Sequence, residues 1–328
     1  MHFSLLFLAL LLPVVSFLAL NISHRMPSLS TVRAFNARFT PSYGTPVAIF
    51  VGGTSGIGRG MAEAFARHTK GNAHIVLVGR NRAAGEAIIA TFPKPTATGV
   101  KHEFVECDVS LMKNVGRTSA ELLARFPKIN FLALSTGVLT LNGRDETEEG
   151  IDRKLAVHYY GRWRFIRDLM PALKAAQKAG EDAKVISVLG AKHGGKIDLD
   201  DLGLKKHFSV LNAALAGPTY NDCMVKGFAD RHPGLSFIHS YPGTVATDIL
   251  RNSNTPALRW ANSLTPLLKL FAYSFEDAGE HQLYALLNAV PGAKLTDDKG
   301  ADYVLKQDYF DTDTVEKVWK HTEEVALV

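Results

Sequence analysis

Residues 47–68 have the sequence VAIFVGGTSGIGRGMAEAFARH, and this stretch decides the fold. Its first five residues, Val47–Val51, form a short apolar run that is typical of a strand buried on both faces. The run ends in the glycine-rich residues 52–58, and from Ile57 onward apolar side chains recur at helical spacing. Glycines let the backbone turn tightly and approach a pyrophosphate, whose charge is attracted by the free N–H groups of a helix N-terminus. The stretch therefore predicts a strand, a phosphate-binding turn and a helix.

The spacing of the glycines at 52, 56 and 58 is G-x-x-x-G-x-G, which resembles the short-chain dehydrogenase/reductase family. Val51 stands where that family usually has Thr. The resemblance extends over about residues 46–290 and implies one α/β domain of the Rossmann type, a doubly wound parallel sheet. It also implies a nicotinamide dinucleotide at the turn, bound by Gly52, Ser55, Gly56, Ile57 and Gly58.

Composition excludes several other classes of protein. The 328 residues are 46% hydrophobic and 21% charged, which is ordinary for a globular chain with one core plus appendages. The net charge of +5 is spread without a dense run, which favours a mildly basic surface over nucleic-acid binding. Cys107 and Cys223 have no Cys or His at metal-ligand spacing, so we expect buried thiols, no disulfide and no metal site.

The first 25 residues contain a long apolar segment. Residues 3–20 would span about 27 Å as a helix, just enough for a bilayer core. A cleaved signal peptide is the alternative, but the segment has no preceding Lys or Arg and no clear cleavage site. We expect a single-pass anchor with the main domain on the cytosolic side, because basic residues follow the segment. If translation starts at Met26, a soluble cytoplasmic protein is expected instead.

The expected organisation has four parts. Residues 1–25 are the anchor, 26–46 a polar linker, 47–290 the dinucleotide-binding domain and 291–328 a peripheral tail. Within the domain, residues 248–272 are rich in Leu, Trp and Pro, and we expect them to form a flap over an apolar substrate.

Three further positions bear on the cofactor. The apolar run His74–Val78 ends in Gly79-Arg80-Asn81 without the acidic residue that grips a ribose 2′-hydroxyl. The guanidinium of Arg80 suits a 2′-phosphate, so we expect NADP (NADPH), held here by Arg80 and Asn81. A surface Arg on a solvated turn is the alternative. The resemblance places Asp108 and Val109 at the adenine and Gly137 at the ribose. A helix N-cap is the alternative role for Asp108.

The segment Tyr241–Thr247 matches the pattern P-G-x-V-x-T of the resembled family. In that family the pattern follows the sixth strand and cradles the nicotinamide carboxamide. The resemblance therefore adds four cofactor-binding residues, which are Pro242, Gly243, Val245 and Thr247.

The catalytic residues depart from the family pattern. The family's catalytic pair is Y-x-x-x-K, in which four residues put a phenol and an ammonium on one helical face. Tyr220 fits the Tyr, but Met224 stands at the Lys position and Lys226 faces away. Without that cation the phenol stays protonated at neutral pH, able to donate a proton but poor as a base.

Two other catalytic positions are also altered. His158 stands at the family's Asn, with a core histidine as the alternative role, and Gly190 stands at its catalytic Ser. Ser187, three residues earlier, reaches substrate only if the end of its strand is shifted, and it is kept as a candidate.

Two functions follow from these residues. The first is an NADPH-dependent carbonyl reductase for an apolar small molecule, with Tyr220 as proton donor. The acidic segment 196–203 resembles the retinol-dehydrogenase-like branch and fungal secondary-metabolism reductases, which implies a role in secondary metabolism. The second is a redox-silent scaffold or non-redox enzyme that keeps the nucleotide site. Members of the family often form homodimers through their long apolar helices, and a homodimer is expected here.

Overall fold

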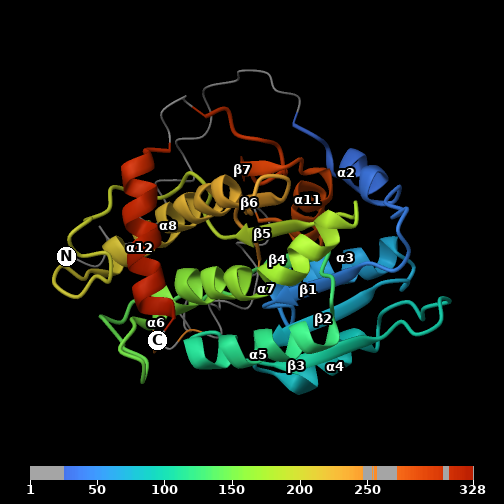
Figure 1. Cartoon of the computed structure of the whole chain (residues 1–328), viewed down its shortest axis with the longest axis horizontal. Helices are drawn as coiled ribbons and strands as arrows, with labels where there is room; N and C mark the ends of the chain where they lie inside the picture. Colours follow the sequence, from blue (N-terminus) through green and yellow to red (C-terminus); the bar gives the residue numbers. More distant parts are fainter. Residues whose placement is uncertain (1–25, 247–252, 254, 257–271, 306–309, 328) are drawn as a thin grey trace.

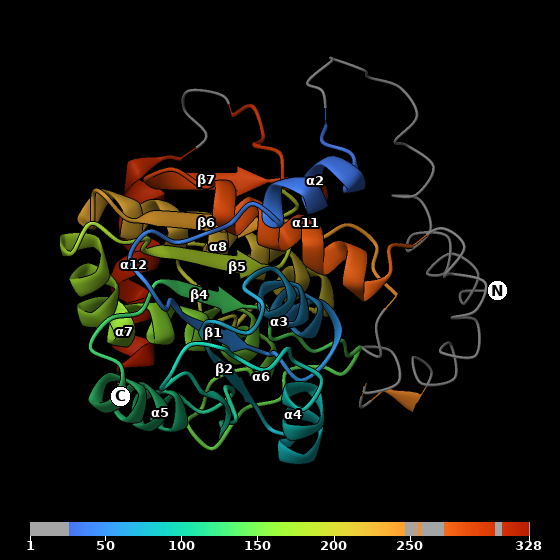
Figure 2. The ribbon, with the colours of Figure 1, turned by 90° about the vertical axis from the view of Figure 1, so that its right-hand side faces the viewer.

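The chain folds around one parallel sheet of seven strands in the order β3-β2-β1-β4-β5-β6-β7. The computed structural model describes residues 26–246, 253, 255–256, 272–305 and 310–327 (Figure 1). Figure 2 shows the strands stacked from β7 down to β2. This order confirms the predicted doubly wound α/β sheet in a single domain. The strands are β1 Val47–Val51, β2 His74–Gly79, β3 His102–Glu106, β4 Phe131–Leu134, β5 Lys184–Val188, β6 Ser236–Ser240 and β7 Gly292–Thr296.

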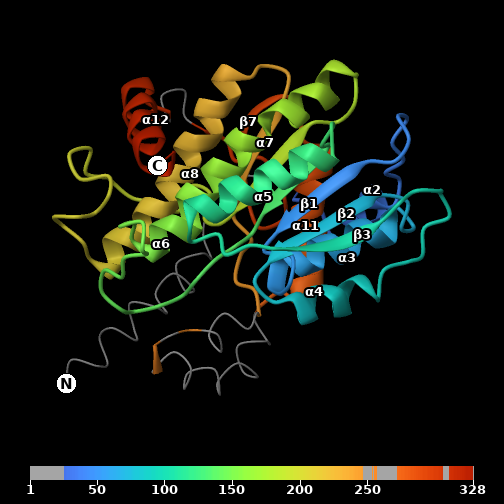
Figure 3. The same cartoon turned by 60° about the horizontal axis from the view of Figure 1, so that its bottom comes forward.

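Helices cover both faces of the sheet, which explains why all five residues of β1 are buried. One face is covered by α3 Gly56–His68, α4 Arg82–Ile89 and α11 Phe275–Asn288. The opposite face is covered by α5 Met112–Arg125, α7 Gly161–Lys178 and α8 Val210–Arg231, which lie side by side in Figure 3. Each layer has its own apolar core against the central strands.

The helical segment before β5 begins at Arg153 and has three parts. A single turn, α6 Arg153–Leu155, is followed by a π-helical turn, η1 Ala156–Tyr160, and only then by α7. Asp152 caps the first turn, because its Oδ1 accepts the N–H groups of Lys154 at 3.0 Å and Leu155 at 3.3 Å. A π-helical turn within a helix often marks a functional site, and this one contains His158.

The segments expected to be a linker and a tail both contain helices or strands that pack on the domain. Helix α2 Leu29–Asn36 packs on α11, where Arg33 pairs with Asp277 at 2.7 Å. At the other end, β7 extends the sheet and α12 Thr312–Ala326 lies on α7 and α8. Trp319 of α12 packs edge-on against Trp163 of α7. A homodimer that used this part of α7 and α8 would have to displace α12.

Among the helices that the structure describes, none is both long and apolar enough to cross a membrane. The predicted anchor, residues 1–25, lies outside the described residues and stays a prediction. The same holds for most of the predicted flap, since only residues 253, 255, 256 and 272 within 248–272 are described.

Candidate functional site

A cavity of about 230 Å³ opens at the carboxyl ends of the first four strands. It lies between the β1–α3 turn, the end of β2, and the segments that follow β3 and β4. The structure brings together most of the predicted cofactor residues, because the lining includes Gly52, Ser55, Gly56, Ile57, Arg80, Asp108, Val109 and Gly137.

The glycines of the turn are required by close packing against the end of β4. Gly52 has φ +89°, and a Cβ there would lie 2.8 Å from the backbone nitrogen of Thr136. Gly58 does not line the cavity, but a Cβ on it would lie 2.1 Å from Oγ of Ser135. Ser55 precedes α3 without a side-chain capping bond, so it leaves the first N–H groups of this helix available to an anion.

The side chains beyond β2 and β3 divide into two groups. The side chain of Arg80 is exposed at the cavity. Asn81 instead caps α4, because its Oδ1 accepts the N–H of Ala84 at 3.0 Å. Asp108 closes a local turn in which Oδ1 accepts the backbone N–H of Ser110 at 3.0 Å. It does not cap α5, because Glu149 accepts the N–H of Met112. Because Oδ1 of Asn81 already accepts the N–H of Ala84, the contact of Asn81 with the cofactor stays a prediction.

The Pro-Gly segment after β6 takes a tight turn, as expected from its sequence. Gly243 has φ +72°, and a Cβ there would lie 2.9 Å from Cβ of Asp298. Val245 forms a parallel bridge with Tyr273. Pro242, Gly243 and Val245 do not line the cavity, and Thr247 lies outside the described residues. Their contact with a nicotinamide stays a prediction.

The hydroxyl of Ser187, the second catalytic candidate, points into the interior. The residue is 0% exposed. Its Oγ accepts a hydrogen bond from Nη1 of Arg162 at 2.7 Å and donates one to Oδ1 of Asn221 at 2.6 Å. Successive side chains of a strand face opposite sides of the sheet, and that of Ser187 faces α7 and α8.

Arg162 is a feature that the sequence analysis missed. It is 1% exposed and forms no ion pair within the described residues. Its guanidinium instead donates to the carbonyl oxygens of Val188, at 3.0 Å, and Thr136, and burial lowers its pKa to about 9. An Arg on the apolar face of a helix was the available signal. The result is a positive charge directly beneath the ends of β4 and β5.

The hydroxyl of Tyr220, the predicted proton donor, also points into the interior. Its side chain is 1% exposed, and its hydroxyl donates to the carbonyl oxygen of Leu202 at 2.9 Å. Burial raises the pKa of this phenol, and Met224 is buried beside it on α8. Lys226 pairs with Asp230, which confirms that it faces away from the predicted pair.

The first two turns of α8 lie beside the loop that follows β5. The helix runs back toward the start of β6, and the N–H of Gly195, beyond β5, bonds to the carbonyl of Leu215 at 3.4 Å. These turns carry Leu211, which is 66% exposed, and Leu215 four residues later. A leucine side chain can neither donate nor accept a proton, so neither residue can act as a catalytic acid or base.

His158 is held as a hydrogen-bond acceptor at the cavity edge. Its Nε2 accepts the N–H of Val138 at 3.0 Å, so the ring proton is on Nδ1. Burial, and then the charge of Arg162, lower the pKa of His158, which keeps the imidazole neutral near pH 7. His158 therefore holds the backbone of the segment that follows β4.

Comparison with known proteins places the chain in a family. Residues 46–197 match the family described as short chain dehydrogenase. The chain is 39% identical to "Oxidoreductase AN1596" of Emericella nidulans, over 82% of this chain and 79% of that protein. It is 30% identical to "Short-chain dehydrogenase/reductase SAT2" of Stachybotrys chartarum, over 79% and 77%.

Solved structures show the same fold at lower identity. The 3-ketoacyl-(acyl-carrier-protein) reductase of Brucella melitensis, complexed with NADH, has a TM-score of 0.55 and 20% identity, covering 80% of this chain and 98% of that one. A short-chain dehydrogenase of Streptomyces avermitilis has a TM-score of 0.53 and 19% identity, over 87% and 95%. From the sheet order, the glycine-lined cavity and these relatives, the chain belongs to the short chain dehydrogenase family of oxidoreductases.

Proposed function

We propose that this protein is an NADPH-dependent reductase that acts on a carbonyl group of an apolar small molecule. The observation that supports this most strongly is the cavity at the β1–α3 turn, with its close-packed glycines and the uncapped start of α3. This is the arrangement that a pyrophosphate needs.

The residues present fit the adenine, the pyrophosphate and a ribose of a dinucleotide. Gly52 and the N–H groups that follow Ser55 would hold the pyrophosphate, and the second carboxylate oxygen of Asp108 would accept from the adenine amino group. The segment from Ser135 to Leu139 lines the opposite wall, where a ribose would lie. The bound cofactor would supply hydride at the carboxyl ends of the central strands.

The preference for NADP over NAD rests on Arg80. Its side chain is exposed at the cavity, directly after β2, where NAD-binding folds carry a carboxylate. The next arginine, Arg82, is within ion-pair distance of Glu86 at 3.6 Å, whereas Arg80 has no ion pair within the described residues. A free guanidinium fork at this point suits a 2′-phosphate.

Reduction is favoured over oxidation because the described residues lack the phenol and ammonium pair that would act as a base. Tyr220 is buried with a raised pKa, and Leu211 and Leu215, in the first two turns of α8, cannot act as a base. Reduction needs only a proton donor, which a neutral or cationic side chain can be. An apolar substrate is supported by the 30% identity to the mouse polyprenol dehydrogenase, over 48% of this chain. A role in fungal secondary metabolism is part of the same proposal.

Calorimetry and turnover assays on the full chain test the proposal in two stages. We expect NADP⁺ to bind at least tenfold more tightly than NAD⁺, and NADPH to be consumed with some members of a panel of apolar aldehydes and ketones. Binding of NADPH without turnover of any carbonyl would favour the redox-silent alternative. Absence of affinity for both nucleotides would refute the proposal.

A further inference from the structure

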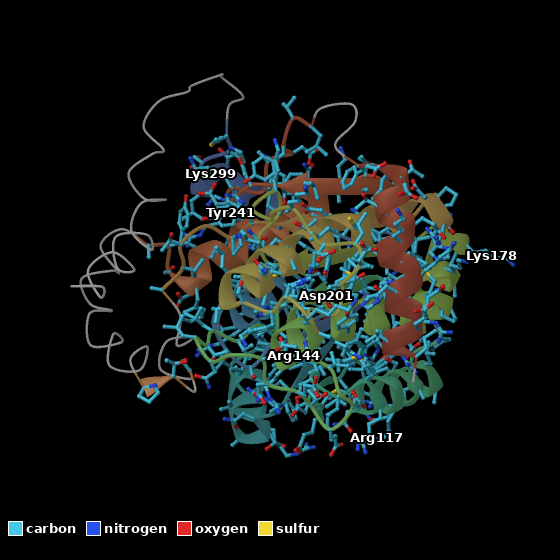
Figure 4. The ribbon with its side chains drawn as sticks, turned by 90° about the vertical axis from the view of Figure 1, so that its left-hand side faces the viewer. Arg117, Arg144, Lys178, Asp201, Tyr241 and Lys299 are labelled. Carbon is cyan, nitrogen blue, oxygen red and sulfur yellow. The ribbon has the colours of Figure 1, made fainter. Side chains whose placement is uncertain are left out.

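The loop after β5 places an imidazole next to a phenol at the ends of two paired strands. The ring centroids of His193 and Tyr241 are 3.9 Å apart, with an interplanar angle of 31°. Tyr241 follows β6 directly, and Ser187 and Val188 of β5 pair with His239 and Ser240 of β6. The carboxyl ends of these strands are where the family's ligands meet in such a sheet. Figure 4 shows Tyr241 near one edge of the molecule, above Arg144 and Asp201.

A buried acid and imidazole hold the backbone of this loop. Oδ1 of Asp222 lies 2.5 Å from Nδ1 of His239, and both side chains are at least 95% buried. Nε2 of His239 accepts the N–H of Gly190 at 3.1 Å, which leaves the ring proton on Nδ1, facing the carboxylate. Oδ2 of Asp222 accepts the N–H of Lys192 at 3.3 Å. The pair therefore fixes two of the three residues that precede His193.

The same loop contains a strained residue. Lys192 has φ +64°, in the left-handed region that costs a residue with a Cβ. Its N–H bond to Asp222 holds that conformation, and the N–H of His193 closes the turn onto the carbonyl of Gly190 at 2.8 Å. Strained backbone conformations that the surrounding structure holds in place occur often at functional sites. Here Asp222 holds the strained backbone of Lys192, next to His193.

The orientation of His193 follows from its own hydrogen bond. Nδ1 lies 2.8 Å from the carbonyl oxygen of Ala191, which only accepts, so Nδ1 carries a proton. Nε2 is then left for another partner, and the residue is exposed. A second proton on Nε2 would make that atom a donor, as a carbonyl oxygen accepting hydride requires.

We infer that His193 is the proton donor of the carbonyl reduction and that Asp222 and His239 are its positioning residues, an inference that rests on the proposed function. The carbonyl carbon would accept hydride from bound NADPH and form a C–H bond, NADPH would be oxidised to NADP⁺ as its own C–H bond breaks, and the C=O π electrons would move to oxygen. The oxygen takes the proton from Nε2, the N–H bond breaks, and the imidazolium becomes a neutral imidazole. Substrate leaves as the alcohol and the ring regains a proton from water.

Several charged or titratable groups face His193. Tyr241 lies against its ring, and burial, followed by the charge of Asp298, raises the pKa of that phenol. Lys192 is adjacent in sequence. His239 and Asp222 hold the backbone of the loop from below. Only the protonated ring donates from Nε2, so kcat should fall as pH rises in the wild type. This fall should be absent in His193→Gln.

Substitution of His193 gives the first test. In His193→Gln we expect kcat to fall on the order of 100-fold or more, with NADPH affinity unchanged. Added imidazole should restore part of the turnover of His193→Ala. The matched control is His207→Gln, since His207 is exposed and lies beside Asp198 at 3.2 Å, and its kcat should not change. In Asp222→Asn, kcat should fall with little change in KM; a lower melting temperature with unchanged kcat would show a purely structural role.

A readout independent of turnover is the tautomer of His193, measured by ¹⁵N NMR on the full chain without substrate. We expect the proton on Nδ1 at high pH; a proton on Nε2 would overturn the inference. An active wild type with an equally active His193→Gln would overturn the inference and leave the proposed function standing. A wild type that reduces no carbonyl would refute the proposed function, and the inference would fall with it.

Discussion

The hydroxyl of Tyr220 and the carbonyl oxygen of Leu202 are joined by a hydrogen bond of 2.9 Å in the protein interior. This bond ties the middle of α8 to the acidic segment 196–203, in which Asp201 also caps the following turn by accepting the N–H of Lys205 at 2.7 Å. The phenol that the sequence suggests for catalysis is therefore a structural link between two elements.

The first prediction concerns that link. In Tyr220→Phe the carbonyl of Leu202 loses its buried donor, and we expect the free energy of unfolding to fall by about 1–3 kcal/mol. NADPH-dependent turnover per folded molecule should stay near the wild-type value. Chemical denaturation and steady-state kinetics measure the two effects. Tyr284→Phe, with only a 3.4 Å contact from Asn288, is the control and should change neither. Loss of turnover in a stable Tyr220→Phe protein would restore the catalytic assignment.

The second prediction concerns cofactor choice. Replacing Arg80 with Ala removes the guanidinium at the end of β2, and we expect NADPH to bind about 10- to 100-fold more weakly because charge-assisted hydrogen bonds are lost. NADH affinity should change by less than about threefold. Fluorescence titration of both cofactors measures this. Arg82→Ala, whose partners are Glu86 and Glu106, is the matched control. Equal losses for both cofactors would contradict a role at the 2′-phosphate.

The third prediction concerns the glycine-rich turn. A Cβ on Gly58 would lie 2.1 Å from Oγ of Ser135 and 2.6 Å from the carbonyl oxygen of Gly52, so the turn must shift. We expect Gly58→Ala to abolish measurable NADPH binding and to lower the melting temperature. Gly143→Ala has open space around its Cβ and should leave both unchanged. Normal NADPH affinity in Gly58→Ala would show that the turn does not touch the cofactor.

The fourth prediction concerns pH and the contact between α3 and α11. Glu280 is 1% exposed; burial opposes its charge, but hydrogen bonds from His68, Asn36 and Arg67 outweigh this and lower its pKa to about 2. Because the folded pKa lies below the ordinary 4.5, the ionised form contributes about 3 kcal/mol above pH 4.5. That contribution is lost progressively as the pH falls from 4.5 through 2.

Glu280→Gln tests this directly. We expect the variant to be about 2–3 kcal/mol less stable than the wild type at pH 7, and the difference to narrow as the pH falls toward 2. Urea denaturation at a series of pH values measures it. Glu276→Gln, in the exposed first turn of the same helix, should show no such trend. A stability difference that stays constant over this pH range would contradict the assignment.

The sequence predicts much of the sheet because its strands are local patterns. The apolar runs Val47–Val51 and His74–Val78, each followed by Gly, place β1 and β2 within one residue of their observed bounds. β7 was missed because Gly292–Thr296 is short and mixes Lys with apolar residues. α12 carried a signal that could have been used, since Val315, Val318 and Trp319 recur at helical spacing.

The glycine-rich turn proposed to bind phosphate was also predicted from the sequence alone. Its function depends on backbone conformation over residues 52–58, and glycine spacing next to a strand and a helix specifies that conformation locally. The direction of Ser187 and Tyr220, the isolated charge of Arg162, and the meeting of His193 with Tyr241 were decided only by the tertiary structure. The reason is physical: a side chain's partners depend on how its strand or helix is rotated against elements far away in the chain, and no local pattern encodes that rotation.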